Sequence, residues 1–204
     1  MWAPAFWAGW IRLDRLDPTA VIAFLAVNTA VLLLYEALPE ELALRGYGWS
    51  TMREAWSPLA ATVTMTVLFC LNMIPGSLIR AAASVLLPGV EMMGFPLAPS
   101  GADPIVYLTQ VLVFGLALIA ARRLPLPGAL TAAIAFHVTV LTVNCVLLGG
   151  LGWIDSGVRT GLAAPEVAAL SLVHPVVGGV LFILIRRWAE HRTTIRAGAG
   201  GPTE

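Results

Sequence analysis

The sequence contains few charged residues for its length. Only 12% of its 204 residues are charged and 58% are apolar, whereas roughly a quarter of the residues in soluble domains are charged. Twelve basic and twelve acidic side chains balance, so no excess of positive charge suggests binding to nucleic acid or to an acidic lipid surface. The composition excludes an ordinary soluble domain and predicts a polytopic membrane protein.

Cysteine is also scarce. Cys70 and Cys145 both lie inside apolar runs, and no CxxC spacing accompanies them. We interpret them as small packing residues, not as a disulfide or a metal-binding pair. A cleavable signal peptide is not expected either, because Arg12 and Arg15 follow the first apolar stretch instead of preceding it.

Apolar runs, in contrast, are abundant and long enough to cross a bilayer, which needs about 20 helical residues. They cover residues 19–38, 57–76, 104–121, 127–150 and 163–187. The sequence therefore predicts an all-α, polytopic transmembrane helix bundle that forms a single domain over residues 1–192. We expect the tryptophan-rich residues 1–17 to form an interfacial segment and residues 193–204 to form a disordered C-terminal tail.

The arginines give an orientation for these five spans. Residues 77–98 are apolar but are interrupted by prolines and charges, so we expect them to lie on the membrane surface or to re-enter it. Three groups of arginines then share one side of the membrane: Arg45 and Arg53; Arg122 and Arg123; and Arg186, Arg187, Arg192 and Arg196. The positive-inside rule places this side, with the C-terminus, in the cytoplasm, although Arg12 and Arg15 oppose that orientation.

Charged residues at membrane depth are costly and are therefore candidates for function. The stretch "EALPEELALRGYG", residues 36–48, follows the first apolar run directly, and we expect a polar hairpin there that also holds Arg53 and Glu54. Glu41 and Arg45 are spaced to pair on one helical face, whereas Glu36 and Glu40 have the same spacing and the same charge. Two interpretations are open: a solvated hairpin whose charges cap helix ends, or an acid/base site in which a glutamate takes a proton from water.

Two histidines lie well inside apolar runs. His137 and Asn144 are two turns apart on one face of the fourth run, and His174 lies at a comparable depth in the fifth. The ordinary interpretation of each histidine is a neutral, hydrogen-bonded core residue. The alternative is that His137 and His174 bind a haem or a chlorin between their helices.

The spacing of these residues resembles a known family. "EELALRG", residues 40–46, resembles the first motif, EExxxR, of the CPBP family, whose members include type II CAAX prenyl endopeptidases and bacteriocin-processing or immunity membrane proteins. "VLFCLNM" stands where the family has an FxxxH helix. "FGLALIAARRLPLPGALTAAIAFHVTVLTVN" is similar to the family's glycine-containing span, basic turn and final motif helix. The resemblance covers roughly residues 36–144.

The resemblance implies cleavage of a membrane-embedded peptide without a cofactor. In this scheme Glu40 activates water, Glu41 lies beside it, and His137 binds the water or the developing oxyanion. Arg45 would orient the glutamates. Asn72 and Asn144 would support the site.

Two positions depart from the family pattern. Met73 stands where the second motif has histidine, with Asn72 as the nearest polar residue, and Leu141 occupies the polar position of the third motif. The alternatives are thus an active glutamate-dependent intramembrane endopeptidase and a non-catalytic relative that serves as a subunit or assembly factor of a larger membrane complex. We expect either protein in a bacterial inner (plasma) membrane. A transporter is disfavoured, because no pair of related halves is evident.

Overall fold

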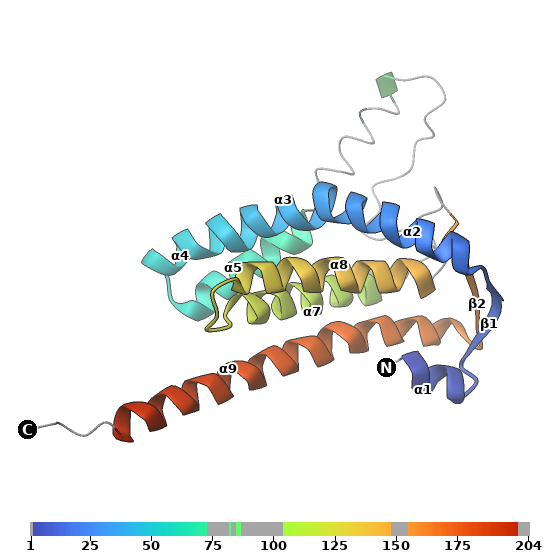
Figure 1. Ribbon diagram of the computed structural model, residues 1–204. Helices are drawn as coiled ribbons and strands as arrows, with labels where there is room; N and C mark the ends of the chain where they lie inside the picture. Colours follow the sequence, from blue (N-terminus) through green and yellow to red (C-terminus); the bar gives the residue numbers. More distant parts are fainter. Residues whose placement is uncertain (1, 73–81, 83–84, 87–103, 148–154, 200–204) are drawn as a thin grey trace, which may run out of the picture.

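The computed structural model of the protein describes residues 2–72, 82, 85–86, 104–147 and 155–199 (Figure 1). It confirms the all-α membrane bundle, because helices make up most of the described residues. Among these residues, four helices are long and apolar enough to cross a bilayer, at Pro18–Ala55, Pro104–Arg122, Ala129–Leu147 and Leu170–Thr193. A shorter apolar helix, α5 (Pro58–Leu71), lies within the predicted second span. The prediction for residues 77–98 falls almost entirely outside the described residues.

The first long helix is a 38-residue rod from Pro18 to Ala55. It consists of α2 (Pro18–Val31), the π-helix η1 (Leu32–Ala37), α3 (Leu38–Glu40), the π-helix η2 (Glu41–Gly48) and α4 (Trp49–Ala55). Asp17 begins it, because its carboxylate accepts a hydrogen bond from the backbone N–H of Ala20 at 3.1 Å.

The prediction of a polar hairpin after residue 38 is wrong, because the helix continues through the charged motif. Pro39 lacks an N–H and its ring crowds the preceding turn. Wider π turns on both sides of α3 absorb this defect without ending the helix. The chain turns only at Trp56, which is extended, and at Ser57, whose hydroxyl caps α5 by accepting from the N–H of Ala60 at 3.2 Å.

The remaining helices pack around α7 (Pro104–Arg122), which contacts α5, α8 (Ala129–Leu147) and α9 (Val173–Ala199). In Figure 1 the rod and α9 lie on opposite sides of α7 and α8. The buried core contains aromatic and small aliphatic residues: Phe69, Phe114, Leu118, Ala121, Ala133 and Val140. The rod packs on α8 through α2, η1 and η2, so the charged motif faces the helix that carries His137.

Glycines on α9 allow it to approach its neighbours closely. A Cβ atom at Gly178 would overlap the ring of Phe136, and one at Gly179 would lie 3.3 Å from the Cβ of Ala117. Small residues at helix interfaces are common in membranes, where close backbone approach provides much of the packing energy. The helix continues to Ala199 and thus extends into residues 193–204, for which the sequence predicted a disordered tail.

A small sheet, which the sequence did not predict, joins the N-terminal segment to the segment that precedes the last helix. Strand β1 (Ile11–Leu16), which follows α1 (Trp2–Trp7), pairs antiparallel with β2 (Val158–Leu162). A 3-10 helix, η3 (Pro165–Leu172), leads from β2 into α9. Arg15 adds exposed ion pairs, at 3.6 Å to Asp17 and at 3.3 Å to Asp155. The predicted interfacial segment therefore contains a strand.

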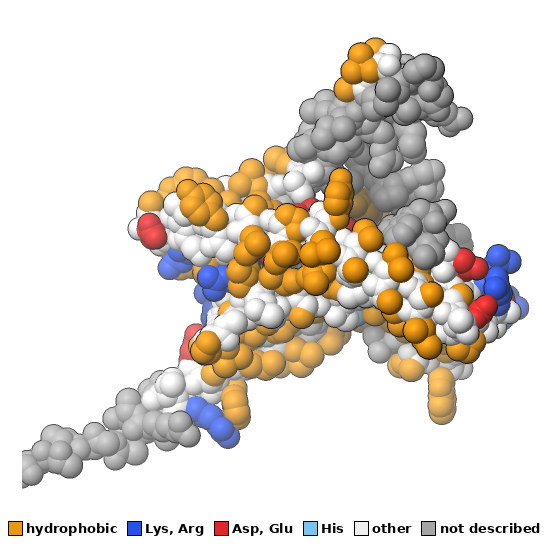
Figure 2. Space-filling view, turned by 45° about the horizontal axis from the view of Figure 1, so that its top comes forward, with side chains coloured by type: hydrophobic (Ala, Val, Ile, Leu, Met, Phe, Trp, Pro, Cys, Tyr) orange, Lys and Arg blue, Asp and Glu red, His pale blue; other side chains and the backbone are white. Residues whose placement is uncertain are grey.

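Basic side chains gather at two ends of the molecule, with a largely hydrophobic surface between them (Figure 2). At one end, Arg122 donates hydrogen bonds to the carbonyl of Arg45 and to the hydroxyl of Ser50. Arg123 interacts electrostatically with Arg53 and Arg186 there. At least one arginine from each of the three groups therefore lies at this end of the bundle.

Candidate active site

Two charged residues of the motif point into the bundle. Glu41 and Arg45 lie one turn apart on η2, and both side chains are fully buried. The guanidinium Nη1 of Arg45 donates to Oε1 of Glu41 at 3.1 Å. A single charge at this depth would be very unfavourable, so the two residues neutralise each other in place.

His137 reaches the same carboxylate from α8. Its Nδ1 lies 3.0 Å from Oε1 of Glu41, and its side chain is 1% exposed. The rod and α8 thus bring together residues that are 96 positions apart in the sequence. We call Glu41, Arg45 and His137 the inner cluster.

Aromatic rings enclose the inner cluster. The guanidinium carbon of Arg45 lies 4.2 Å from the ring centroid of Phe69. The imidazole of His137 meets Phe69 and Phe114 edge to face, with centroids at 6.1 and 4.9 Å. A cation over a ring face and edge-to-face rings are both favourable, and they fix the orientation of the two polar groups.

Gly115 on α7 makes room for this arrangement. A Cβ atom there would lie 3.0 Å from the ring of Phe69 and 3.6 Å from Nη2 of Arg45. Any larger residue would push Phe69 toward the guanidinium. The sequence analysis missed this role, although "FG" inside an otherwise bulky apolar run was a visible signal.

Glu40 occupies a more open position than Glu41. Its side chain is half-buried, and its Oε1 accepts a hydrogen bond from Nδ2 of Asn72 at 2.6 Å. Asn72 itself is exposed at the end of α5. We call Glu40 and Asn72 the outer pair. Glu40 directly precedes Glu41 on the rod, so the outer pair adjoins the inner cluster.

The other predicted site residues lie apart from these contacts. Asn144 is half-buried on α8, and its Oδ1 has no partner among the described residues. His174 lies on α9 with its ring 6.2 Å from that of Phe136. Within the described residues no contact joins His174 to His137, and a haem or chlorin between them stays a prediction. Met73 lies outside the described residues.

Arg122 has a structural role. From the sequence it was expected only to help orient the spans in the membrane. Its Nε donates to the carbonyl of Arg45 at 3.2 Å, and its guanidinium lies 5.9 Å from the ring of Trp49. This hydrogen bond joins η2 to α7 in addition to the bonds within the helix. Arg122 thereby fixes η2 against α7.

The inner cluster retains hydrogen-bonding capacity. Oε2 of Glu41 and both Nε and Nη2 of Arg45 are buried, and none has a partner among the described residues. The same described part of the chain contains no group of three or more histidine, cysteine or acidic side chains that could hold a metal ion. The candidate site presents two carboxylates, an imidazole and a guanidinium.

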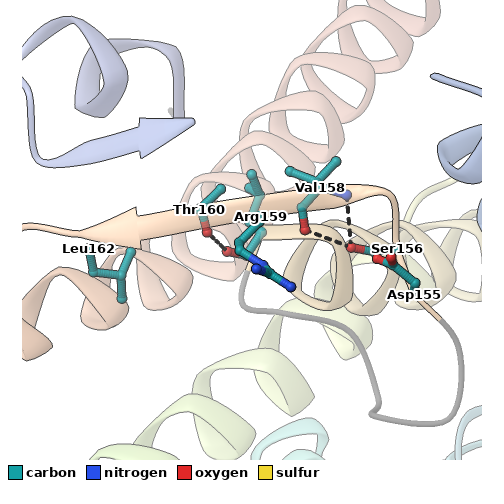
Figure 3. A pocket seen from close by; sticks show the side chains of 7 residues that line it. Asp155, Ser156, Val158, Arg159, Thr160 and Leu162 are labelled. Carbon is teal, nitrogen blue, oxygen red and sulfur yellow. Dashed lines mark hydrogen bonds between the residues drawn. The ribbon is translucent and has the colours of Figure 1, made fainter. Parts of the chain in front are cut away.

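A cavity of about 270 Å³ beside β2 does not belong to this site (Figure 3). Its polar side chains already bond locally, because the Ser156 hydroxyl donates to the carbonyl of Val158 and the Thr160 hydroxyl donates to that of Leu147. These bonds stabilise the turn into β2 and the link to α8.

Comparison with known proteins identifies the family. A family model described as type II CAAX prenyl endopeptidase Rce1-like matches residues 22–143, which is more than half of the chain. The match contains both the inner cluster and the outer pair. No curated protein and no solved structure matches. The chain is an integral membrane protein, and it belongs to the Rce1-like family of type II CAAX prenyl endopeptidases.

Proposed function

We propose that the protein is a glutamate-dependent endopeptidase that hydrolyses membrane-embedded peptides, prenylated peptides among them. One observation carries the proposal: a half-buried carboxylate, Glu40, adjoins a fully buried cluster that combines a carboxylate, a guanidinium and an imidazole. Two glutamates of adjacent sequence thus occupy very different surroundings, as an acid/base site requires. A solvated hairpin would expose both of them.

The inner cluster would orient the imidazole. Because Oε1 of Glu41 faces Nδ1 of His137 at 3.0 Å, the favoured tautomer carries its proton on Nδ1 and leaves Nε2 for water or substrate. Arg45 balances the charge of Glu41 and holds its carboxylate in place. In this role Glu41 and Arg45 act through His137 as positioning residues.

Glu40 would act as the base. Its carboxylate takes a proton from water, and the water oxygen attacks the carbonyl carbon of the scissile peptide bond. The Nε2 atom of His137 accepts a hydrogen bond from the same water and orients it, while negative charge develops on the carbonyl oxygen. Glu40 then returns the proton to the leaving nitrogen as the C–N bond breaks, so one water molecule supplies the new carboxylate and the new amine.

Asn72 would hold Glu40 in position but could not carry a proton. Its amide donates at 2.6 Å, yet it has no titratable group. This contact also favours the second candidate function, a non-catalytic family member in a larger membrane complex. Asn72 and Met73 together stand where the family pattern has a proton-carrying histidine.

The proposed site would open on one membrane face. The arginine-rich end of the bundle is the end that the positive-inside rule assigns to the cytoplasm. We propose a bacterial inner membrane as its location, with the C-terminus in the cytoplasm.

A cleavage assay separates the two functions. Purified protein in vesicles is incubated with a fluorogenic, lipidated peptide, and Glu40→Gln is compared with Glu54→Gln, which removes an exposed glutamate of the same rod. Loss of a general base lowers the rate by about 100-fold or more, so we expect Glu40→Gln to lose cleavage and Glu54→Gln to retain it. Equal rates in the two variants would contradict the proposal.

The variant Met73→His tests the second candidate directly. If wild-type protein leaves the peptide intact while Met73→His cleaves it in a Glu40-dependent way, the natural chain is a non-catalytic relative. Cleavage by the wild-type protein would exclude that candidate.

A further inference from the structure

A groove of about 400 Å³ lies between α5, α7 and α9, apart from the candidate active site. Two kinds of side chain line it. Arg123, Arg186 and Arg187 supply guanidinium groups, and Leu116, Ile119 and Ile183 supply an apolar wall. Its ligand must therefore combine an anionic part with an apolar part.

The positive charge of the groove is only partly compensated. Partial burial and then the nearby guanidinium groups of Arg186 and Arg53 lower the pKa of Arg123. The carboxylate of Glu190 acts in the opposite direction and raises the pKa of Arg123. Its Oε1 lies 3.4 Å from Nε of Arg186. Within the described residues, one carboxylate thus faces several guanidinium groups, and an additional anion would be attracted.

The apolar wall of the groove lies next to these arginines, on the side toward the membrane interior. Leu116 and Ile183 are each 43% exposed, so neither is covered by the bundle, and Ile119 is buried between them and the core. Arg123 directly follows the end of α7, and Arg186 and Arg187 follow the apolar part of α9. Guanidinium groups on long side chains next to an apolar helix segment would reach the level of the bilayer phosphates.

We propose that this groove binds one anionic glycerophospholipid. Its phosphate would lie against Arg123, Arg186 and Arg187, because guanidinium groups bind phosphate oxygens with paired hydrogen bonds. One acyl chain would follow Leu116, Ile119 and Ile183. The lipid would thereby link α7 to α9, and the proposal does not depend on whether the protein cleaves peptides.

Native mass spectrometry of the purified protein tests this assignment. The protein is released from vesicles of equal phosphatidylglycerol and phosphatidylcholine, and retained lipids are counted. The double variant Arg123→Gln/Arg187→Gln is compared with Arg159→Gln/Arg192→Gln, which removes the same charge outside this groove. Since each arginine near an acidic lipid contributes roughly 1 kcal/mol, we expect the first variant to retain phosphatidylglycerol at least about tenfold less than wild type.

A second variant tests the acyl chain. Ala120→Trp fills the apolar side of the groove and keeps all three arginines, so we expect it also to lose phosphatidylglycerol, while inorganic phosphate does not displace the lipid from wild type. Circular dichroism and gel filtration establish that each variant is folded. Equal retention in Arg123→Gln/Arg187→Gln and its control, full retention in Ala120→Trp, or displacement by inorganic phosphate would each overturn the assignment.

Discussion

The inner cluster and the outer pair contain adjacent glutamates in opposite environments. Glu41 is fully buried and held by Arg45 and His137, whereas Glu40 is half-buried and, among the described residues, accepts a hydrogen bond from the exposed Asn72. The two groups also differ in how closely they follow the family pattern. The inner cluster retains the motif residues, whereas the outer pair has an asparagine near the position of the motif histidine. The difference predicts that the inner cluster stabilises the fold and orients His137, whereas the outer pair would supply the reactivity of the proposed site.

The largest expected effect comes from breaking the inner cluster. Arg45→Met leaves the carboxylate of Glu41 buried with only an imidazole beside it, and such a loss costs about 3–5 kcal/mol of unfolding free energy. Thermal unfolding in detergent measures it, with Arg192→Met as the matched control on an exposed part of α9. A melting temperature equal to that of the control would contradict the assigned role.

Overpacking the wall of the inner cluster should have a smaller effect. Gly115→Val adds methyl groups at a position where even a Cβ atom would lie 3.0 Å from the ring of Phe69. Overpacking of this kind costs about 1–3 kcal/mol of unfolding free energy. Leu112→Val, on the exposed face of the same helix, is the control. If both variants melt at the wild-type temperature, Gly115 does not set the spacing of α7 and α5.

A double-mutant cycle measures the link between the two helices directly. We expect Glu41→Gln and His137→Gln to be coupled by about 1 kcal/mol or more, because the two side chains are in contact. The corresponding cycle of Glu40→Gln and His137→Gln should give a coupling below about 0.5 kcal/mol. Equal couplings would remove the distinction between the inner cluster and the outer pair.

The smallest effect on stability is expected at the outer pair. Glu40→Gln keeps the size of the side chain and an oxygen that can accept from Asn72, so the unfolding free energy should change by no more than about 0.5 kcal/mol. Thermal unfolding of Glu40→Gln beside Glu54→Gln provides the measurement. A loss as large as that of Arg45→Met would make Glu40 a structural residue.

The sequence predicted the membrane spans, and the approach of the glutamate motif to His137, better than it predicted the connections between the spans. Runs of apolar residues locate transmembrane helices reliably, because lipid leaves the backbone few alternatives to a helix. The i,i+4 spacing of Glu41 and Arg45 likewise predicted their pairing. These features depend on local sequence alone.

The hairpin was predicted wrongly for a physical reason. Pro39 and the charges around it are typical of a chain reversal, but the rod continues through them because π turns and contacts with α7 and α8 stabilise it. Those contacts arise only after the helices have packed. The same holds for β1, which pairs with residues almost 150 positions away.

The most direct test of the account is peptide hydrolysis in water enriched in ¹⁸O, followed by mass spectrometry of the released fragments. We expect the wild-type protein to place one ¹⁸O atom in the new carboxyl terminus, and Glu40→Gln to slow this incorporation by about 100-fold or more. Incorporation at the same rate in Glu40→Gln, or an intact peptide with the wild-type protein, would contradict a hydrolytic centre built on Glu40.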